Sequence, residues 1–163
     1  MIIFPQKSMK IAIFGCYLLS MNMYASDELN IPEGKKISER TFMLIKPHAV
    51  LEKKVDGIID MVESEGFMII ATKSMILTSE QVYELYKNDN HRHCEWFDEY
   101  VKTLIVSSVI VLVLEKEQAI IEWVILKNKV REVYGINLQE NAVHGSDNRI
   151  DAQREIAIFF KCL

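Results

Sequence analysis

Apolar residues follow two different spacings along the chain after residue 39. Consecutive apolar positions predict buried strands, whereas apolar positions three and four residues apart predict helices. The predicted strands are 41–46, 67–77, 107–115 and a short one at 142–144. The predicted helices are 50–66, 78–87, 94–104, 117–135 and 149–160.

Residues that stop or cap regular structure lie between these segments. Pro47 ends the first strand, and Gly66 and Gly135 end two helices. Thr78 or Ser79 is suited to cap the helix at 78–87. The resulting order, β–α–β–α–α–β–α–β–α, predicts an α+β sandwich of ferredoxin-like topology, in which an antiparallel sheet is covered by helices. We expect these helices on one face of the sheet, in one domain spanning residues 39–160.

The first 38 residues have a different character. Lys7 and Lys10 precede an apolar stretch at 11–19, which is the layout of a secretory signal peptide and is too short to span a membrane as a stable helix. Met23 occupies a position where a cleavage site favours a small residue, so a retained leader fits equally well. Residues 1–26 therefore predict a signal-like leader and the secretory route, or a cytoplasmic protein if the leader does not function. Residues 27–38 predict a polar linker.

Composition excludes several classes of protein. The chain has 163 residues, half of them hydrophobic and 26% charged, which suits a single globular domain. Its formal net charge of −4 gives no signature of nucleic-acid binding. Three widely separated cysteines, at 16, 94 and 162, indicate neither a disulfide framework nor a zinc site.

One histidine lies in a setting that suits catalysis. His144 follows the short apolar strand and precedes the turn-forming residues 145–148, so its ring is expected at a sheet edge. A nucleophilic imidazole needs one bare nitrogen and a partner that orients the other, and Ser146 and Glu155 are candidates for that partner. The local sequence fits a turn histidine with a local hydrogen bond at least as well.

Three stretches resemble the nucleoside diphosphate kinase family, in particular a divergent branch of it. They are ERTFMLIKP at 39–47, SEGF at 64–67 and YGINLQENAVHGSDNRIDAQREIAIFF at 134–160. The resemblance implies transfer of the γ-phosphate of ATP or another nucleoside triphosphate to a nucleoside diphosphate, by a ping-pong reaction through a phosphohistidine on His144. It also implies magnesium held mainly by the nucleotide phosphates, with no protein metal site.

The resemblance assigns roles to further residues. Lys46 would reach a phosphate and the ribose hydroxyls, Arg131 would bind phosphate, and Asn141 would bond the sugar hydroxyls. Trp96 corresponds to a residue that stacks on the base, with Tyr86 as support. Aligning Trp96 requires a two-residue insertion before it, and a core position suits it equally well. The remaining histidines are expected to have no catalytic role. His91 and His93 are expected in a solvated loop, and His48 at a surface position.

The chain departs from the family between 119–126 and 130–135. Only residues 127–129 connect these segments, where the family has a longer loop that supplies a second phosphate-binding arginine, a threonine and trimer contacts. Lys127 or Lys129 could substitute as a point charge. The shortened segment predicts slower catalysis and a weakened homo-oligomer. It also leaves two alternatives open: a nucleotide-binding pseudo-enzyme or interaction module with little turnover, and a phosphohistidine relay to another protein.

Overall fold

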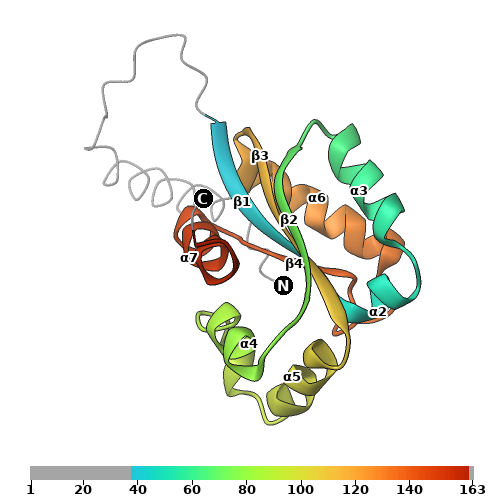
Figure 1. Ribbon diagram of the computed structural model, residues 1–163, viewed down its shortest axis with the longest axis vertical. Helices are drawn as coiled ribbons and strands as arrows, with labels where there is room; N and C mark the ends of the chain where they lie inside the picture. Colours follow the sequence, from blue (N-terminus) through green and yellow to red (C-terminus); the bar gives the residue numbers. More distant parts are fainter. Residues whose placement is uncertain (1–37, 162–163) are drawn as a thin grey trace, which may run out of the picture. The chain divides into compact units, whose positions relative to one another are not determined.

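The computed structural model describes residues 38–161. The predicted leader and, apart from Ser38, the predicted linker lie outside the described residues. Four strands form one sheet: β1 (Ser38–Ile45), β2 (Met68–Ile76), β3 (Ser108–Glu117) and β4 (Val143–Gly145). Their order is β2-β3-β1-β4, and every neighbouring pair is antiparallel (Figure 1). The predicted α+β fold of ferredoxin-like topology is confirmed.

The helices match the predicted periodicity in most places. They are α2 (Pro47–Leu51), α3 (Val55–Ser64), α4 (Ser79–Leu85), the 3-10 helix η2 (Asn90–His93), α5 (Phe97–Ile105), α6 (Ala119–Tyr134) and α7 (Arg149–Phe159). The helix predicted at 50–66 is in fact two, because Lys53 takes a left-handed conformation with φ of 57°. Pro47 ends β1 as expected, but it also starts α2, where its missing amide hydrogen costs nothing.

Helices cover both faces of the sheet, so the expectation of one covered face was wrong. Phe42 and Leu44 pack with α4, α5 and α7, whereas Met43 and Ile45 pack with α2, α3 and α6. Figure 1 shows α7 on one side of β1, with α3 and α6 on the other. Consecutive residues of a strand point to opposite faces, and all four of these side chains are buried. An unbroken apolar strand therefore requires cover on both sides.

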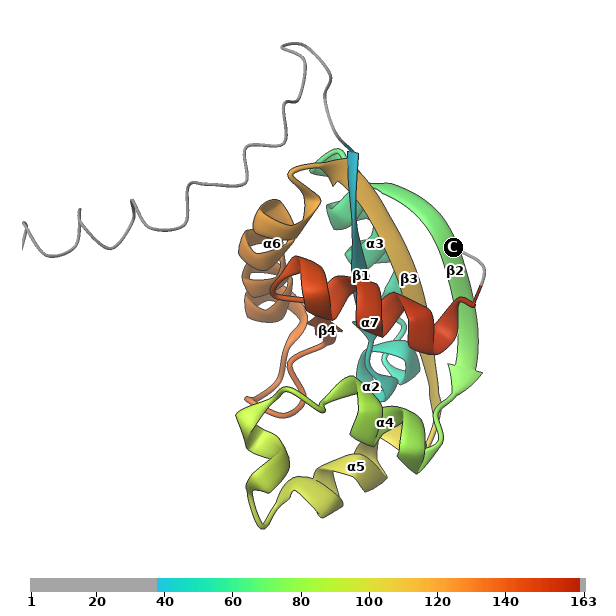
Figure 2. The same ribbon diagram turned by 90° about the vertical axis from the view of Figure 1, so that its left-hand side faces the viewer.

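The segment between α4 and α5 projects from one end of the sheet (Figure 2). Thr78 starts α4 with a capping box, because its hydroxyl accepts from the Gln81 amide and the Gln81 side chain accepts from the Thr78 amide. Tyr86 follows α4 and meets Tyr100 of α5, with 2.9 Å between their hydroxyl oxygens. This contact fixes the two helices beside the sheet.

Helix α6 is continuous from Ala119 to Tyr134. The helix predicted at 117–135 is confirmed, and residues 127–129 form part of it rather than a loop. Neither proline nor glycine interrupts these sixteen residues. Lys127 and Arg131 are therefore four residues apart on one helix and project from the same side. Within residues 38–161, no helix has the length and apolar character that crossing a bilayer requires.

Candidate active site

One cavity collects most of the residues selected from the sequence. Its volume is about 610 Å³, and it lies among the end of β1, the α4–α5 segment, α6 and the chain around β4. Six of the predicted site residues line it: Lys46, Tyr86, Trp96, Arg131, Asn141 and His144. Ser146 and Glu155 do not line this cavity; both are buried behind His144.

The backbone of His144 is fixed at the sheet edge. His144 is the middle residue of β4 and pairs with Leu44 of β1. Gly145 follows, packed so closely that an added Cβ would meet the indole nitrogen of Trp123 and lie 2.7 Å from the Phe42 carbonyl oxygen. Glycine is therefore required here for β4 to lie against α6. The sheet and α6 together place the imidazole at the cavity.

The two ring nitrogens of His144 have different surroundings. Nε2 is buried and lies 3.4 Å from Glu155 Oε2, which is longer than an ordinary hydrogen bond. Nδ1 also makes no hydrogen bond with any of the described residues. Unlike Nε2, however, it is not fully buried, and the ring lines the cavity. The ring also rests against Tyr86, with 4.8 Å between ring centroids. Nδ1 is thus the nitrogen available to a ligand in the cavity.

Glu155 is held in place from both sides of its carboxylate. The Ser146 hydroxyl donates to Oε2 at 2.7 Å, and Arg154 Nη2 donates to Oε1 at 3.2 Å. The Arg154 guanidinium also donates to the carbonyl oxygens of Glu84 and Leu85, at the end of α4. Sequence reasoning paired Ser146 and Glu155 with His144 but missed Arg154, because the α4 carbonyl groups that hold Arg154 lie about seventy residues away in the chain.

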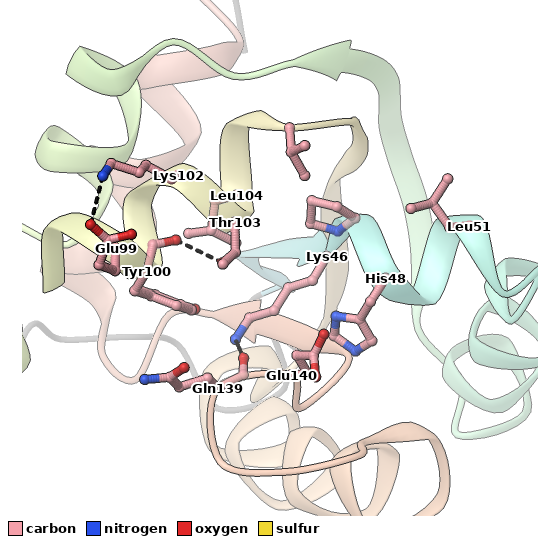
Figure 3. A pocket seen from close by; sticks show the side chains of 12 residues that line it. Lys46, His48, Leu51, Glu99, Tyr100, Lys102, Thr103, Leu104, Gln139 and Glu140 are labelled. Atoms are coloured by element: carbon pink, nitrogen blue, oxygen red, sulfur yellow. Dashed lines mark hydrogen bonds and ion pairs between the residues drawn. The ribbon is translucent and has the colours of Figure 1, made fainter. Parts of the chain in front are cut away.

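Lys46 enters the cavity from the end of β1. Its side chain is almost completely buried and donates to Asn141 Oδ1 at 2.6 Å. It also donates to the Gln139 carbonyl oxygen at 2.8 Å (Figure 3). Its ammonium lies 5.1 Å from the centroid of the Tyr100 ring. Burial, reinforced by the positive charge of Arg131, lowers the pKa of Lys46 to about 7. An anion in the cavity would restore the charge of this lysine.

His48 is partly buried and makes a contact that the sequence did not predict. Its Nε2 accepts a hydrogen bond from the Ala142 amide at 3.2 Å, and the ring lies beside Glu140 (Figure 3). Ala142 has φ of 66°, so this contact supports a strained turn that leads into β4. Burial lowers the pKa of His48, which favours the neutral ring that can accept the bond. This contact could not be predicted from spacing, because Ala142 lies 94 residues away from His48 in the chain.

Two cations reach the cavity from α6. Arg131 donates through Nε to the Val143 carbonyl oxygen at 3.2 Å, while its terminal nitrogens make no hydrogen bond with other described residues. Lys127 donates to the carbonyl oxygen of Gly145 at 2.9 Å and to Asp147. Burial lowers the pKa of both side chains. Two cations held in a desolvated wall make this cavity suited to a multiply charged anion.

Trp96 lies at the cavity and not in the core. It is 39% exposed, and its ring is close to those of His91 and Tyr100, at 5.6 and 6.0 Å between centroids. Leu138 also lines the cavity while 94% exposed, and sequence reasoning missed it. An isolated leucine in the polar turn NLQEN was the available signal. These two residues offer apolar surface for a flat, uncharged part of a ligand.

The remaining histidines do not form a metal site with their neighbours. His91 and His93 are exposed in η2, and His91 Nδ1 lies 2.7 Å from Asp89 Oδ1. Among the described residues, no group of three or more histidine, cysteine or acidic side chains is arranged to hold a metal ion. Asp89 and Asp147 are the acidic residues that line the cavity, and each already contacts a basic side chain.

The sequence of this chain is similar to those of a known enzyme family. The family profile described as "Nucleoside diphosphate kinase" matches residues 39–162. A nucleoside diphosphate kinase of Histophilus somni (strain 2336) is 38% identical over 132 residues, covering 75% of this chain and 92% of the relative. Another, from Sorangium cellulosum (strain So ce56), is also 38% identical over 132 residues, covering 75% of this chain and 90% of the relative.

Solved structures show the same similarity. The orthorhombic crystal form of Aquifex aeolicus nucleoside diphosphate kinase superposes with a TM-score of 0.68 and 31% identity, covering 76% of this chain and 96% of that one. The enzyme of Encephalitozoon cuniculi gives a TM-score of 0.68 at 26% identity, covering 75% and 88%. The residues matched by the family profile include every strand and helix that contributes to the cavity.

Proposed function

Since the chain belongs to the nucleoside diphosphate kinase family and transfers phosphoryl groups between nucleotides, we propose that His144 carries the phosphoryl group. The observation that supports this role is the asymmetry of the imidazole. Nε2 lies against Glu155, while Nδ1 is free at a cavity that also contains Lys46 and Arg131. A nucleophilic imidazole needs one bare nitrogen facing the substrate, and a carboxylate beside the other nitrogen stabilises the charge that develops on the ring.

The first half-reaction transfers a phosphoryl group to the ring. The Nδ1 lone pair attacks the γ-phosphorus, and the bond from that phosphorus to the bridging oxygen breaks. The nucleoside diphosphate leaves with the electron pair of that bond. The imidazole keeps its Nε2 proton and becomes positively charged, and the Glu155 carboxylate 3.4 Å away stabilises this charge. In the second half-reaction, a terminal oxygen of another diphosphate attacks the same phosphorus, and the Nδ1–P bond breaks.

The neighbouring side chains position the nucleotide and neutralise it. Lys46 and Arg131 would contact phosphate oxygens, and the two free terminal nitrogens of Arg131 suit bidentate contact. Asn141 holds Lys46 through Oδ1 and bonds the Leu138 carbonyl oxygen through Nδ2. An amide has four hydrogen-bonding positions, so two remain for a sugar hydroxyl. Trp96 would stack on the base at the exposed end of the cavity.

Magnesium fits this site as a companion of the nucleotide. In the empty cavity its two carboxylates, Asp89 and Asp147, contact His91 and Lys127, and no group of three or more metal-ligating side chains is arranged for an ion among the described residues. The ion would therefore be held mainly by phosphate oxygens. When bound, it would neutralise part of the charge on the phosphate chain.

A labelling experiment tests the role of His144. Purified protein is incubated with ATP carrying a labelled γ-phosphate and magnesium, and the labelled protein is then mixed with GDP. We expect an acid-labile label on the wild-type chain, its transfer to GDP, and no label on His144→Ala. Labelling of the alanine variant to the wild-type level would refute the proposal. Nucleotide binding with no label on the wild type would favour the pseudo-enzyme, and transfer of the label to a protein instead of GDP would favour the relay.

A further inference from the structure

Lys127 is a buried cation whose position is set by the nucleophile's own strand. Its side chain is 5% exposed, and its ammonium donates to the carbonyl oxygen of Gly145, the residue directly after His144. Its other partner is the Asp147 carboxylate. An ammonium has three hydrogens, so one remains for a further acceptor. Lys127, His144 and Arg131 all line the same cavity.

The pairing of Lys127 with Asp147 is one that an anion can displace. Burying a lysine is costly unless its charge is matched, and burial lowers the pKa of Lys127 despite the nearby carboxylate. Asp147 is 70% exposed, so it can turn into solvent with little loss of packing. The carbonyl of Gly145 would keep the ammonium in place when the carboxylate leaves.

Lys129 lies on the same helix but, unlike Lys127, points away from the cavity. Its side chain is 51% exposed, its ammonium lies 3.2 Å from Glu65, and it does not line the cavity. The two lysines are two residues apart, so they point to different sides of α6. The sequence offered both as replacements for the missing loop cations, and the structure places only Lys127 at the cavity.

We propose that Lys127 binds the terminal phosphoryl group during its transfer to His144. When the cavity is empty, the Lys127 ammonium is instead paired with the Asp147 carboxylate. This inference rests on the proposed role of His144. The incoming phosphoryl oxygens replace the Asp147 carboxylate on Nζ, while the Lys127–Gly145 hydrogen bond persists. Lys127 then stands with Lys46 and Arg131 as the third cation around the phosphate chain. A hydrogen bond from a charged donor to the phosphoryl group is expected to change the rate by about 10- to 100-fold.

Single-turnover labelling separates this inference from the proposed function. Wild-type chain, Lys127→Met and the matched control Lys129→Met are mixed with labelled ATP, and the rate of label appearance on His144 is measured. We expect K127M to be slower by about 10- to 100-fold and K129M to stay within about twofold of wild type. Equal rates for wild type and K127M would overturn the inference while leaving His144 as the carrier. A wild-type chain that takes no label on His144 would instead overturn the proposed function.

A binding comparison distinguishes phosphate contact from a structural role. The Kd values of ATP and AMP are measured in the His144→Ala background, where the nucleotide is not consumed. Lys127→Met should raise the Kd of ATP by about tenfold and the Kd of AMP by less than twofold, because AMP lacks the terminal phosphates. Equal weakening of both would overturn the inference in favour of a structural role. If K127M does not fold, Asp147→Asn serves instead. Removing the competing carboxylate should lower the Kd of ATP several-fold and leave the Kd of AMP unchanged. An unchanged Kd for ATP would overturn the inference.

Discussion

Raising the pH from 7.5 to 9 should weaken nucleotide binding, because the protonated fraction of Lys46 in the empty cavity falls steeply over this interval. Burial holds the pKa of Lys46 at about 7 in the empty cavity. A bound phosphate favours the charged ammonium, so the pKa rises in the complex and binding takes up a proton. Affinity is therefore full below pH 7, falls as the pH rises above the pKa of the free protein, and levels off at the pKa of the complex.

The size of the effect follows from this pKa. About a quarter of the Lys46 side chains are protonated at pH 7.5 and about one in a hundred at pH 9. If only the charged form binds phosphate, the Kd of ADP rises by about 20-fold over this range, equivalent to about 2 kcal/mol. The terminal phosphate of ADP is already ionised at the start of this range, so it adds little to the slope.

Calorimetric titration with ADP at several pH values measures both the Kd and the proton uptake. Lys46→Arg is the control, because a guanidinium stays protonated throughout and should give a flat profile. Burial also lowers the pKa of Lys127, so repeating the titration in Lys127→Met removes its contribution. A wild-type Kd that stays within twofold between pH 7.5 and 9, or an equal slope in K46R, would refute the reasoning.

Three further substitutions test other parts of the site. Gly145→Ala should lower the free energy of unfolding by at least 2 kcal/mol in denaturant titrations, because its Cβ would collide with Trp123; a loss under 0.5 kcal/mol would contradict the close approach. Glu155→Gln should slow labelling of His144 by about 10- to 100-fold with little change in ADP affinity, since it removes the charge behind Nε2; an unchanged rate would rule out that role. Trp96→Ala should raise the Kd of ADP by about 5- to 30-fold and leave the melting temperature within a few degrees, as expected for an exposed stacking residue; a large stability loss with unchanged affinity would assign it to the core instead.

The strands and most helices could be predicted because their signals are local. The unbroken apolar segment of β1 correctly predicted a strand, and the capping residue Thr78 correctly predicted the start of a helix. The observed ends of both elements differ from the predicted ends by only a few residues. The same strand also carried the signal for helices on both faces, since Phe42 and Met43 are adjacent and both buried. The division of the helix at 50–66 escaped prediction because Lys53, unlike glycine, gives no sign of a left-handed conformation.

The site was predictable where it coincides with a family motif, and elsewhere it was not. His144, Lys46 and Asn141 lie in quoted motifs, and the structure brings them to one cavity. The contacts of His48 with Ala142 and of Arg154 with the end of α4 join segments many residues apart. Spacing along the chain says nothing of such pairs.

Phosphorus NMR of the phosphorylated chain tests the central claim most directly. Brief exposure to ATP and magnesium, followed by denaturation in alkali, preserves a phosphohistidine and allows its resonance to be compared with those of the two isomers of phosphohistidine. Because Nε2 of His144 is buried beside Glu155 and Nδ1 is free, we predict a phosphorus bonded to Nδ1. A phosphorus on Nε2, or on a residue other than His144, would contradict the account.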